Sequence, residues 1–319
     1  MKTMKSILLA LILMVSLSSV FAEDNSAAVF TRLGIDARSI GMGGTGGAFL
    51  DNVSSAYLNP AVLADVKRIE LTTSTRQGMG LDRAQNAVAL GFRIPTGYVA
   101  AFWNNGSVSD FEEYDGAGNY VGTFNNAEHA LGISYAAKLG KFNMGVTPKM
   151  YISNVHEDTK TGYSMDMGIL YHVNRYFNMG FHVRDLVSDY DGDGTKAPRE
   201  LVPSIAAFPI PGLILAADLS GEDDFSSSRL KLGVEYWLGV RDDTEIGSSL
   251  SGIRIKENAT WTDILSKTQA GIRAGVNDGA FSAGFGLRFK MLEMNYAYQM
   301  ANNELLLNDT HLYSLLLRF

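Results

Sequence analysis

The stretch "GAFSAGFGLRFKMLEMNYAYQMA", residues 279–301, decides the fold because its side chains alternate in polarity with a period of two. In its first half the apolar positions are Phe281, Ala283, Phe285, Leu287 and Phe289, and Ser282, Gly284, Gly286, Arg288 and Lys290 lie between them. In its second half they are Leu292, Met294, Tyr296, Tyr298 and Met300, with Glu293, Asn295 and Gln299 between them. Such alternation over about ten residues is typical of transmembrane β-strands, which turn one face to lipid and the other to a polar lumen.

The same alternation recurs along the chain, as in "SRLKLGVEYWLG" (228–239) and "GYSMDMGILYHV" (162–173). It predicts fourteen strands, at 67–78, 84–94, 97–109, 126–139, 141–155, 161–173, 176–186, 199–208, 212–221, 228–239, 269–277, 280–290, 291–301 and 309–319. Single-chain outer-membrane barrels have an even number of strands. Soluble β-sandwiches also alternate, but their strands are shorter and their polar side chains face outward. The sequence therefore predicts an all-β protein, a transmembrane antiparallel β-barrel.

The first residues, "MKTMKSILLALILMVSLSSVFAED", have the form of a secretory signal peptide. Two lysines precede an apolar run, and Val20-Phe21-Ala22 forms a cleavage site, so residues 1–22 are expected to be removed on export. The chain has no Cys, which excludes a disulfide-stapled secreted domain and a lipid anchor on Cys. Its net charge of −7 with no basic stripe argues against nucleic-acid binding. We therefore expect a protein of the cell outer membrane of a Gram-negative-type bacterium, in contact with outer-membrane lipid.

The chain ends in "HLYSLLLRF", residues 311–319, in which Tyr313, Leu315, Leu317 and Phe319 share one face. An aromatic residue that closes an alternating terminal strand is the pattern that bacterial outer-membrane barrels present to their assembly machinery. The sequence therefore predicts a barrel assembly signal at these residues, with the barrel assembly machinery as a partner.

The lengths of the connections set the expected orientation. If the last residue lies in the periplasm, the periplasmic turns are the short ones, "PTG", "LGK", "VNR", "PIPG" and the step at Lys290-Met291. The extracellular loops then include the long stretches 104–126 and 187–199. One connection breaks this asymmetry, because residues 240–268 are long but fall on the periplasmic side. Either this segment is a periplasmic insertion with a short helix at 261–267, or the strand count is wrong by two.

The glycine-rich run "GMGGTGG", residues 41–47, satisfies G-x-G-x-x-G, a pattern that can cradle a dinucleotide pyrophosphate. A dinucleotide loop should follow a buried apolar strand, whereas the preceding "LGIDARS" is polar and broken by glycine. The exported location also argues against a nucleotide ligand. We therefore expect these glycines to let the backbone pack closely against a barrel wall.

The segment "LGIDARSIGMGGTGGAFLDNVSSAYLNPAVLA", residues 33–64, resembles the N-terminal region of the PorV/PorQ family, which is related to the FadL-type fatty-acid transporters. The match lies in Ala37-Arg38-Ser39, in Gly41, Gly43 and Gly44, and in Asn59, Pro60 and Ala61, and it extends through "AADLSG", "LGVEYWLG" and the closing strands. The resemblance implies a fourteen-stranded barrel whose N-terminal segment folds into the lumen. It assigns residues 23–66 to this plug and residues 67–319 to the barrel.

The resemblance implies two functions between which no feature of the sequence chooses. FadL-type members pass hydrophobic small molecules sideways through the wall, which we take as the first hypothesis. PorV-type members help to handle secreted proteins that leave by type IX secretion, which is the alternative.

Side chains of positive and negative charge, together with two His, are expected to face the lumen. This mixture favours a filled lumen over an open pore. They are Arg93, Lys149, Asp166, His172, His182, Arg184, Lys231, Glu235, Arg273, Arg288, Glu293 and Arg318. The five His residues are scattered, and none lies in a recognisable catalytic motif, so the sequence predicts no enzyme and no catalytic residue.

One acidic stretch has metal-ligand spacing. "DYDGDGTKAPRE" matches D-x-D-x-D-G-x5-E through Asp189, Asp191, Asp193, Gly194 and Glu200, a spacing that lets carboxylates converge on Ca²⁺. No helices are expected to flank the loop, and Pro198 interrupts it. A solvated acidic loop is the alternative, and no other cofactor is expected.

Overall fold

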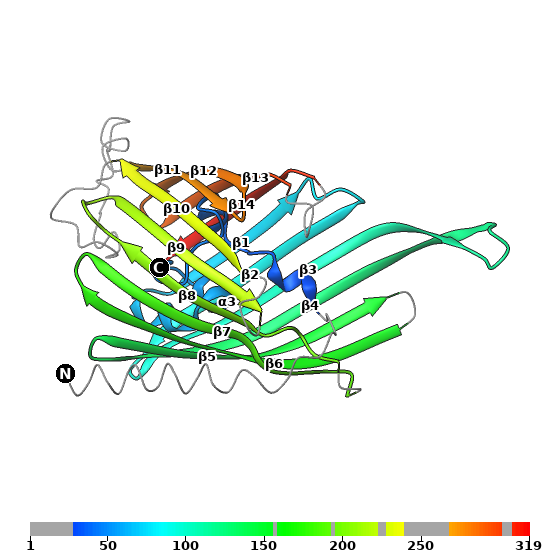
Figure 1. The fold of residues 1–319 in the computed structure, drawn as a ribbon, viewed down its shortest axis with the longest axis horizontal. Coiled ribbons are helices and arrows are strands. Elements are labelled where there is room, and N and C mark those ends of the chain that lie inside the picture. The colour runs from blue at the N-terminus through cyan, green and yellow to red at the C-terminus, as the bar shows by residue number, and fades with distance from the viewer. Residues whose placement is uncertain (1–27, 156–157, 193–194, 223–227, 239–267, 302–307) are drawn as a thin grey trace.

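The computed structural model describes residues 28–155, 158–192, 195–222, 228–238, 268–301 and 308–319, and these form a closed barrel of fourteen antiparallel strands (Figure 1). Each strand pairs with its neighbours in sequence, and β1 pairs with β14 to close the ring. The expected signal peptide at 1–22 and the expected helix at 261–267 lie outside the described residues. No helix among the described residues is long and apolar enough to cross a membrane.

The strand bounds follow the predicted alternation. They are β1 (Glu70–Gln77), β2 (Arg83–Ile94), β3 (Gly97–Tyr114), β4 (Tyr120–Leu139), β5 (Phe142–Val155), β6 (Asp158–Asn174), β7 (Phe177–Tyr190), β8 (Glu200–Ala207), β9 (Leu213–Glu222), β10 (Arg229–Leu238), β11 (Thr268–Asn277), β12 (Ala280–Phe289), β13 (Leu292–Gln299) and β14 (Thr310–Arg318). The predicted count is confirmed. We call the end with the tight turns at 95–96, 140–141, 175–176, 208–212 and 290–291 the short-turn end, and the opposite end the long-loop end.

The two faces of the sheet differ in polarity as predicted. On β12 the side chains of Phe281 and Phe285 are exposed on the outer face, whereas Ser282 is buried on the inner face. On β10 the apolar Leu232 and Val234 are exposed outside, and Glu235 is completely buried inside. The outer face is therefore the apolar face, and the polar side chains are buried inside the barrel.

Two of the register shifts in the sheet change the shape of the wall. The register of β3 and β4 shifts between Val108 and Phe111, and beyond the shift the two strands pair only with each other. This hairpin extends beyond the neighbouring strands at the long-loop end (Figure 1). The β6–β7 register shifts between Met165 and Met167, where Asp185 has a φ of 53° and its side chain is buried inside the barrel.

The lumen holds the N-terminal segment, residues 28–66, which we call the plug (blue in Figure 1). Its short helices are η2 (Val29–Arg32), α2 (Ala37–Gly41), α3 (Ser55–Leu58) and η3 (Pro60–Asp65). Asp36 caps α2 by accepting a hydrogen bond from Ser39 N, and Asn59 caps η3 by accepting one from Ala61 N. The plug starts at Ala28, packed near the long-loop end against Tyr151 and Tyr190, and ends beside β1 at the short-turn end.

Apolar side chains of the plug pack against apolar side chains of the wall inside the barrel. Val53, Tyr57 and Leu63 are buried in one cluster with wall residues of β2 and β3, including Tyr98 and Phe102. A second cluster joins Met42, Phe49 and Val62 to Leu170 and Phe208. The plug is thus the core of the barrel, packed on several sides of the wall.

Candidate functional site

The glycine run of the plug lies directly against the backbone of the wall. A Cβ on Gly233 of β10 would lie 2.4 Å from the carbonyl oxygen of Met42, and a Cβ on Gly275 of β11 would lie 2.1 Å from Gly43 N. Gly43 itself has a φ of 73°, and a Cβ there would lie 2.6 Å from the carbonyl oxygens of Leu232 and Val276. Any side chain at these positions would force the two backbones apart, so glycine on both sides allows the close approach.

The same run uses its amide groups to bind an anion supplied by the wall. Gly46 N and Gly47 N donate to the Asp218 carboxylate of β9 over 3.0 and 3.1 Å, and Gly43 N donates to Ser282 Oγ over 2.9 Å. Successive backbone N–H groups of this kind form an anion-binding concavity. In this protein the concavity holds a carboxylate of the chain itself, which explains the likeness of the sequence to a phosphate-binding loop.

The second plug motif, Asn59-Pro60-Ala61, contacts glycines of β5 and β6 in the same way. A Cβ on Gly145 of β5 would lie 2.4 Å from the carbonyl carbon of Pro60, and a Cβ on Gly168 of β6 would lie 1.9 Å from Asn59 Oδ1. Asn59 Nδ2 donates to the carbonyl oxygen of Gly47 over 2.7 Å, which ties the two motifs together. Ala61 is completely buried.

A buried charge cluster joins the plug to β10 and its neighbours, and we call it the Glu235 cluster. Arg38 Nη2 lies 2.7 Å from Glu235 Oε1, and its Nη1 lies 2.6 Å from Asp51 Oδ1. Arg273 Nε shares the Glu235 carboxylate at 2.5 Å. The cluster continues along the wall and pairs four cations with four carboxylates, namely Arg38, Arg273, Arg288 and Arg318 with Asp51, Glu70, Glu235 and Glu293. A buried charge is costly unless it is paired, so the plug supplies part of the counter-charge that the buried Glu235 needs.

A second cluster, the Asp185 cluster, lies on β5 to β8. Asp185 Oδ1 accepts hydrogen bonds from Lys149 Nζ, Tyr151 Oη and Ser164 Oγ over 2.6 to 2.7 Å. From the plug, Arg32 Nη2 lies 3.2 Å from Asp185 Oδ2, and Arg32 Nη1 lies 3.1 Å from Glu200 Oε2. Its three cations and three carboxylates are Arg32, Lys149 and Arg184 with Asp166, Asp185 and Glu200. The plug is therefore anchored on both sides of the lumen.

At the short-turn end of the barrel, Asp65 of the plug makes a third ionic contact with the wall. The carboxylate oxygens of Asp65 lie 3.1 Å from Lys138 Nζ and 3.0 Å from His172 Nε2. Burial raises the pKa of the Asp65 carboxyl, but the contacts with His172, Asn143 and Lys138 together outweigh it, and the net pKa is lowered. A lowered pKa means that this contact stabilises the folded state above the unfolded pKa of about 3.9 and is lost as the pH falls through the folded pKa.

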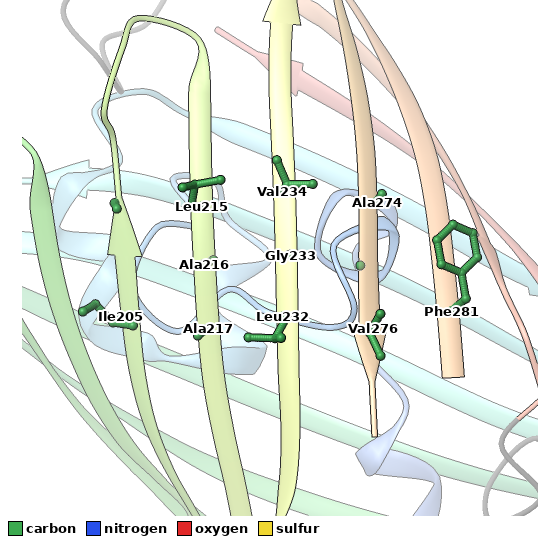
Figure 2. Close-up of a pocket in the computed structure, with 12 residues that line it drawn as sticks. Ile205, Leu215, Ala216, Ala217, Leu232, Gly233, Val234, Ala274, Val276 and Phe281 are labelled. Carbon is green, nitrogen blue, oxygen red and sulfur yellow. The ribbon is translucent and has the colours of Figure 1, made fainter. Parts of the chain in front are cut away.

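The outer face of the wall is hollowed where the glycine run presses from inside. A groove of about 530 Å³ lies over β8 to β12. Figure 2 shows its side chains, with the plug ribbon passing behind the strands. Its lining is apolar, and the residues that form it are Ile205, Ala207, Leu215, Ala216, Ala217, Leu232, Gly233, Val234, Ala274, Gly275, Val276 and Phe281. A smaller groove of about 240 Å³ lies over β4 to β7, where Gly145 and Gly168 face the second plug motif.

The residues of the predicted assembly signal lie apart from the lumen. Tyr313 and Leu315 lie on the exposed outer face of β14, with Leu317 on the same face, and Phe319 N donates to the carbonyl oxygen of Ile69 over 2.9 Å at the closure of the barrel. Their role as an assembly signal stays a prediction.

The predicted Ca²⁺ ligands fall at the β7–β8 connection. Asp189 pairs with Tyr163 in the β6–β7 ladder, Asp191 lies 3.8 Å from Lys160, and Asp193 lies outside the described residues. Glu200 is buried in the Asp185 cluster, where two arginines bind it. Within the described part of the chain there is no group of three or more acidic or His side chains that could hold a metal ion. Ca²⁺ binding stays a prediction.

Sequence reasoning placed the charged wall residues inside the barrel but did not find their partners. Glu235 was expected in the lumen, yet its contact with Arg38 joins residues 197 positions apart. Asp218 and Asp185 were not identified at all. The spacing around Asp218 predicts no ligand, and the alternation of β7 does not place Asp185 inside the barrel. The available signal was the presence of two Arg and several glycines in a plug that faces a charged lumen.

Solved structures share this fold. The Ralstonia pickettii toluene transporter TbuX matches with a TM-score of 0.57 at 13% identity, over 91% of this chain and 100% of that chain. The Pseudomonas putida toluene transporter TodX matches with 0.55 at 10%, over 88% and 96%. A Pseudomonas aeruginosa FadL homologue matches with 0.53 at 10%, over 89% and 98%. The chain has the fold of these barrels.

The amino-acid sequence does not assign the chain to a family. No protein-family model matches the chain, and no curated protein matches it. The resemblance to the PorV/PorQ family therefore stays a hypothesis.

Proposed function

We propose that this protein is an outer-membrane transporter of hydrophobic small molecules that leave the barrel sideways through the wall. The observation that carries the proposal is the apolar groove on the outer face of β8 to β12. At Gly233 and Gly275, which line this groove, the wall has no side chain between the groove and the plug. The names of two structures with the same fold, both toluene transporters, support a hydrophobic substrate.

The two faces of the wall favour a sideways route for an apolar solute. Inside, the plug is held by charged clusters in which an apolar molecule would have to displace paired ions. Outside, the groove is within the roughly 300–1,000 Å³ range of small-molecule sites and has alkyl and aromatic walls. A displacement of the glycine run away from Gly233 and Gly275 would need no side chain of the wall to move, because neither glycine has one.

The test is uptake of toluene by cells that carry the full-length protein in their outer membrane, with the wild type compared against Ala217→Trp. Ala217 lines the groove on the outer face, so an indole there fills the groove without touching the plug. The matched control is Ala101→Trp, an exposed position on β3 outside the groove. We expect the wild type and the control to accelerate uptake equally and Ala217→Trp to slow it. Equal uptake by all three proteins contradicts the sideways route, and no uptake above empty cells contradicts the transporter.

The alternative that the resemblance implies is a role in protein secretion. It predicts stable protein partners bearing secretion signals, whereas a transporter should carry lipid-like molecules after gentle extraction. Mass spectrometry of the extracted protein distinguishes the two, and secreted cargo without any bound lipid would replace the transporter hypothesis. In either case we propose a protein that is not an enzyme.

A further inference from the structure

The described connections at the two ends of the barrel carry opposite charge. At the short-turn end, residues 66–69, 95–96, 140–141, 175–176, 208–212 and 290–291 include five Lys or Arg and no Asp or Glu. At the long-loop end, the described connections 78–82, 115–119, 191–192, 195–199, 278–279, 300–301 and 308–309 include five Asp and two basic residues. This difference is a property of the connections and is independent of the paired charges in the lumen.

The basic residues at the short-turn end form one arc. Five lie in the connections and two at the adjoining strand ends, and they are Lys67, Arg68, Arg93, Lys138, Lys141, Arg175 and Lys290. Because the order of strands in the barrel follows the sequence and β14 adjoins β1, the arc runs without a break in the ring from β12 through β1 to β7. We call these residues the basic arc.

Exposed apolar side chains lie at the same level as the basic arc. Leu139, Tyr176 and Met291 are 61%, 39% and 49% exposed, each next to a basic residue in the sequence. The Arg175 guanidinium lies 4.5 Å from the centre of the Tyr176 ring. Basic and aromatic residues side by side are typical of the boundary between hydrocarbon and headgroups, where a long side chain keeps its stem in the apolar layer and its charge in the polar one.

We propose that the basic arc binds the headgroups of anionic phospholipids in the membrane leaflet at the short-turn end. Arg93 and Lys138 contact the plug, where Lys138 is paired with Asp65. The charge of the other members matches a phosphate-bearing surface, and their spread around the perimeter fits a layer of lipids that surrounds the barrel. The inference does not depend on what the barrel transports.

The test uses the full-length protein purified in detergent and titrated with phosphatidylglycerol or with phosphatidylcholine of the same acyl chains. Native mass spectrometry counts the lipids retained. The variant is Lys141→Gln with Arg175→Gln, because neither side chain is among the plug contacts of the arc. The matched control is Lys160→Gln with Lys196→Gln, which removes two positive charges at the long-loop end. Heat-modifiable mobility in gels verifies that each protein is folded.

We expect the wild type and the control to retain phosphatidylglycerol in preference to phosphatidylcholine. Each basic side chain near an anionic surface contributes on the order of fivefold in affinity, so the variant should bind phosphatidylglycerol about 25-fold more weakly. Equal retention of both lipids by the wild type, or equal weakening in variant and control, overturns the proposal. Displacement of phosphatidylglycerol by polyglutamate at equal charge would overturn it in favour of an acidic protein partner.

Discussion

Glu235 joins the plug to the wall, because Arg38 of the plug and Arg273 of the wall share its carboxylate. Glu235→Gln keeps the shape but removes the counter-charge of the buried Arg273 guanidinium and leaves Arg38 paired with Asp51 alone. Removing one partner of a buried pair is expected to lower the free energy of unfolding by about 3 kcal/mol. Urea unfolding measures this. The control is Glu222→Gln at the exposed end of β9, where a change within about 0.5 kcal/mol is expected. Equal shifts in both variants would contradict the assignment.

Gly275 tests the backbone contact between plug and wall. Gly275→Val would place side-chain atoms where Gly43 N and the Met42 carbonyl carbon lie, so the glycine run should move away from the wall. The chain has no Cys, so a single cysteine introduced at Ala48 in the plug reports this displacement. Ala48 is completely buried, and the expected result is faster labelling by a water-soluble maleimide in the Gly275→Val background.

The control for this prediction is Gly122→Ala in the β3–β4 hairpin, where an added Cβ would meet no atom within 4 Å. Labelling should stay as slow as in the single-cysteine protein. If Gly275→Val also leaves labelling unchanged, the close approach of the two backbones does not hold the plug.

At this scale the sequence predicted which face each side chain takes but not its partner. Ser282 shows the limit: the alternation places it in the lumen, yet nothing in the sequence relates it to Gly43, 239 residues away. Asp185 shows another limit, because its inward position depends on a bulge in β7 that the period-two pattern does not predict.

Among the elements, all fourteen strands were predictable because a lipid-facing strand must alternate. The far parts of β3 and β4 were missed. Their sequence "SDFEEYDG" and "NYVGTFNN" was assigned to a loop, because strands that extend beyond the other strands have no lipid-facing side and need no alternation. The plug helices are short, and their local signals are the capping residues, Asp36 before α2 and Asn59-Pro60 at the start of η3.

The β3–β4 hairpin is expected to be dispensable for the stability of the barrel. Residues 111–124 pair only with each other, since β2 reaches β3 no further than Val108 and β5 meets β4 from Asn126. Replacing them with a two-residue Asn-Gly turn should leave the temperature at which the protein loses its folded gel mobility unchanged. A lowered temperature would mean that the hairpin supports the wall through contacts absent from this ladder.

The last strand is expected to limit assembly. β14 closes the ring against β1, and Phe319 supplies the final backbone hydrogen bond, to Ile69. Deleting Phe319 should reduce the fraction of heat-modifiable protein in the outer membrane, whereas Phe319→Tyr, which keeps the aromatic end, should not. Equal membrane levels of the deletion and the wild type would remove this residue from the assembly signal.

For the whole molecule, the plug is expected to be what closes the lumen to ions. A chain that lacks residues 28–66 should form a barrel with stepwise conductance in planar bilayers, because charged wall residues would then face water. The wild type should show little conductance under the same conditions. The hairpin replacement is the control, since it removes exposed residues and should leave the lumen closed.

The path of the plug through the barrel has a consequence for the order of events in time. The plug is synthesised before the strands of the wall, and Glu235 of β10, the partner of Arg38, follows it by 197 residues. Pairing β1 with β14 would enclose the plug, which extends from the long-loop end to the short-turn end and leads directly into β1. Contacts so distant in sequence form slowly. We expect the segment to be in position before the ring closes, so that the wall folds around a segment that was synthesised earlier.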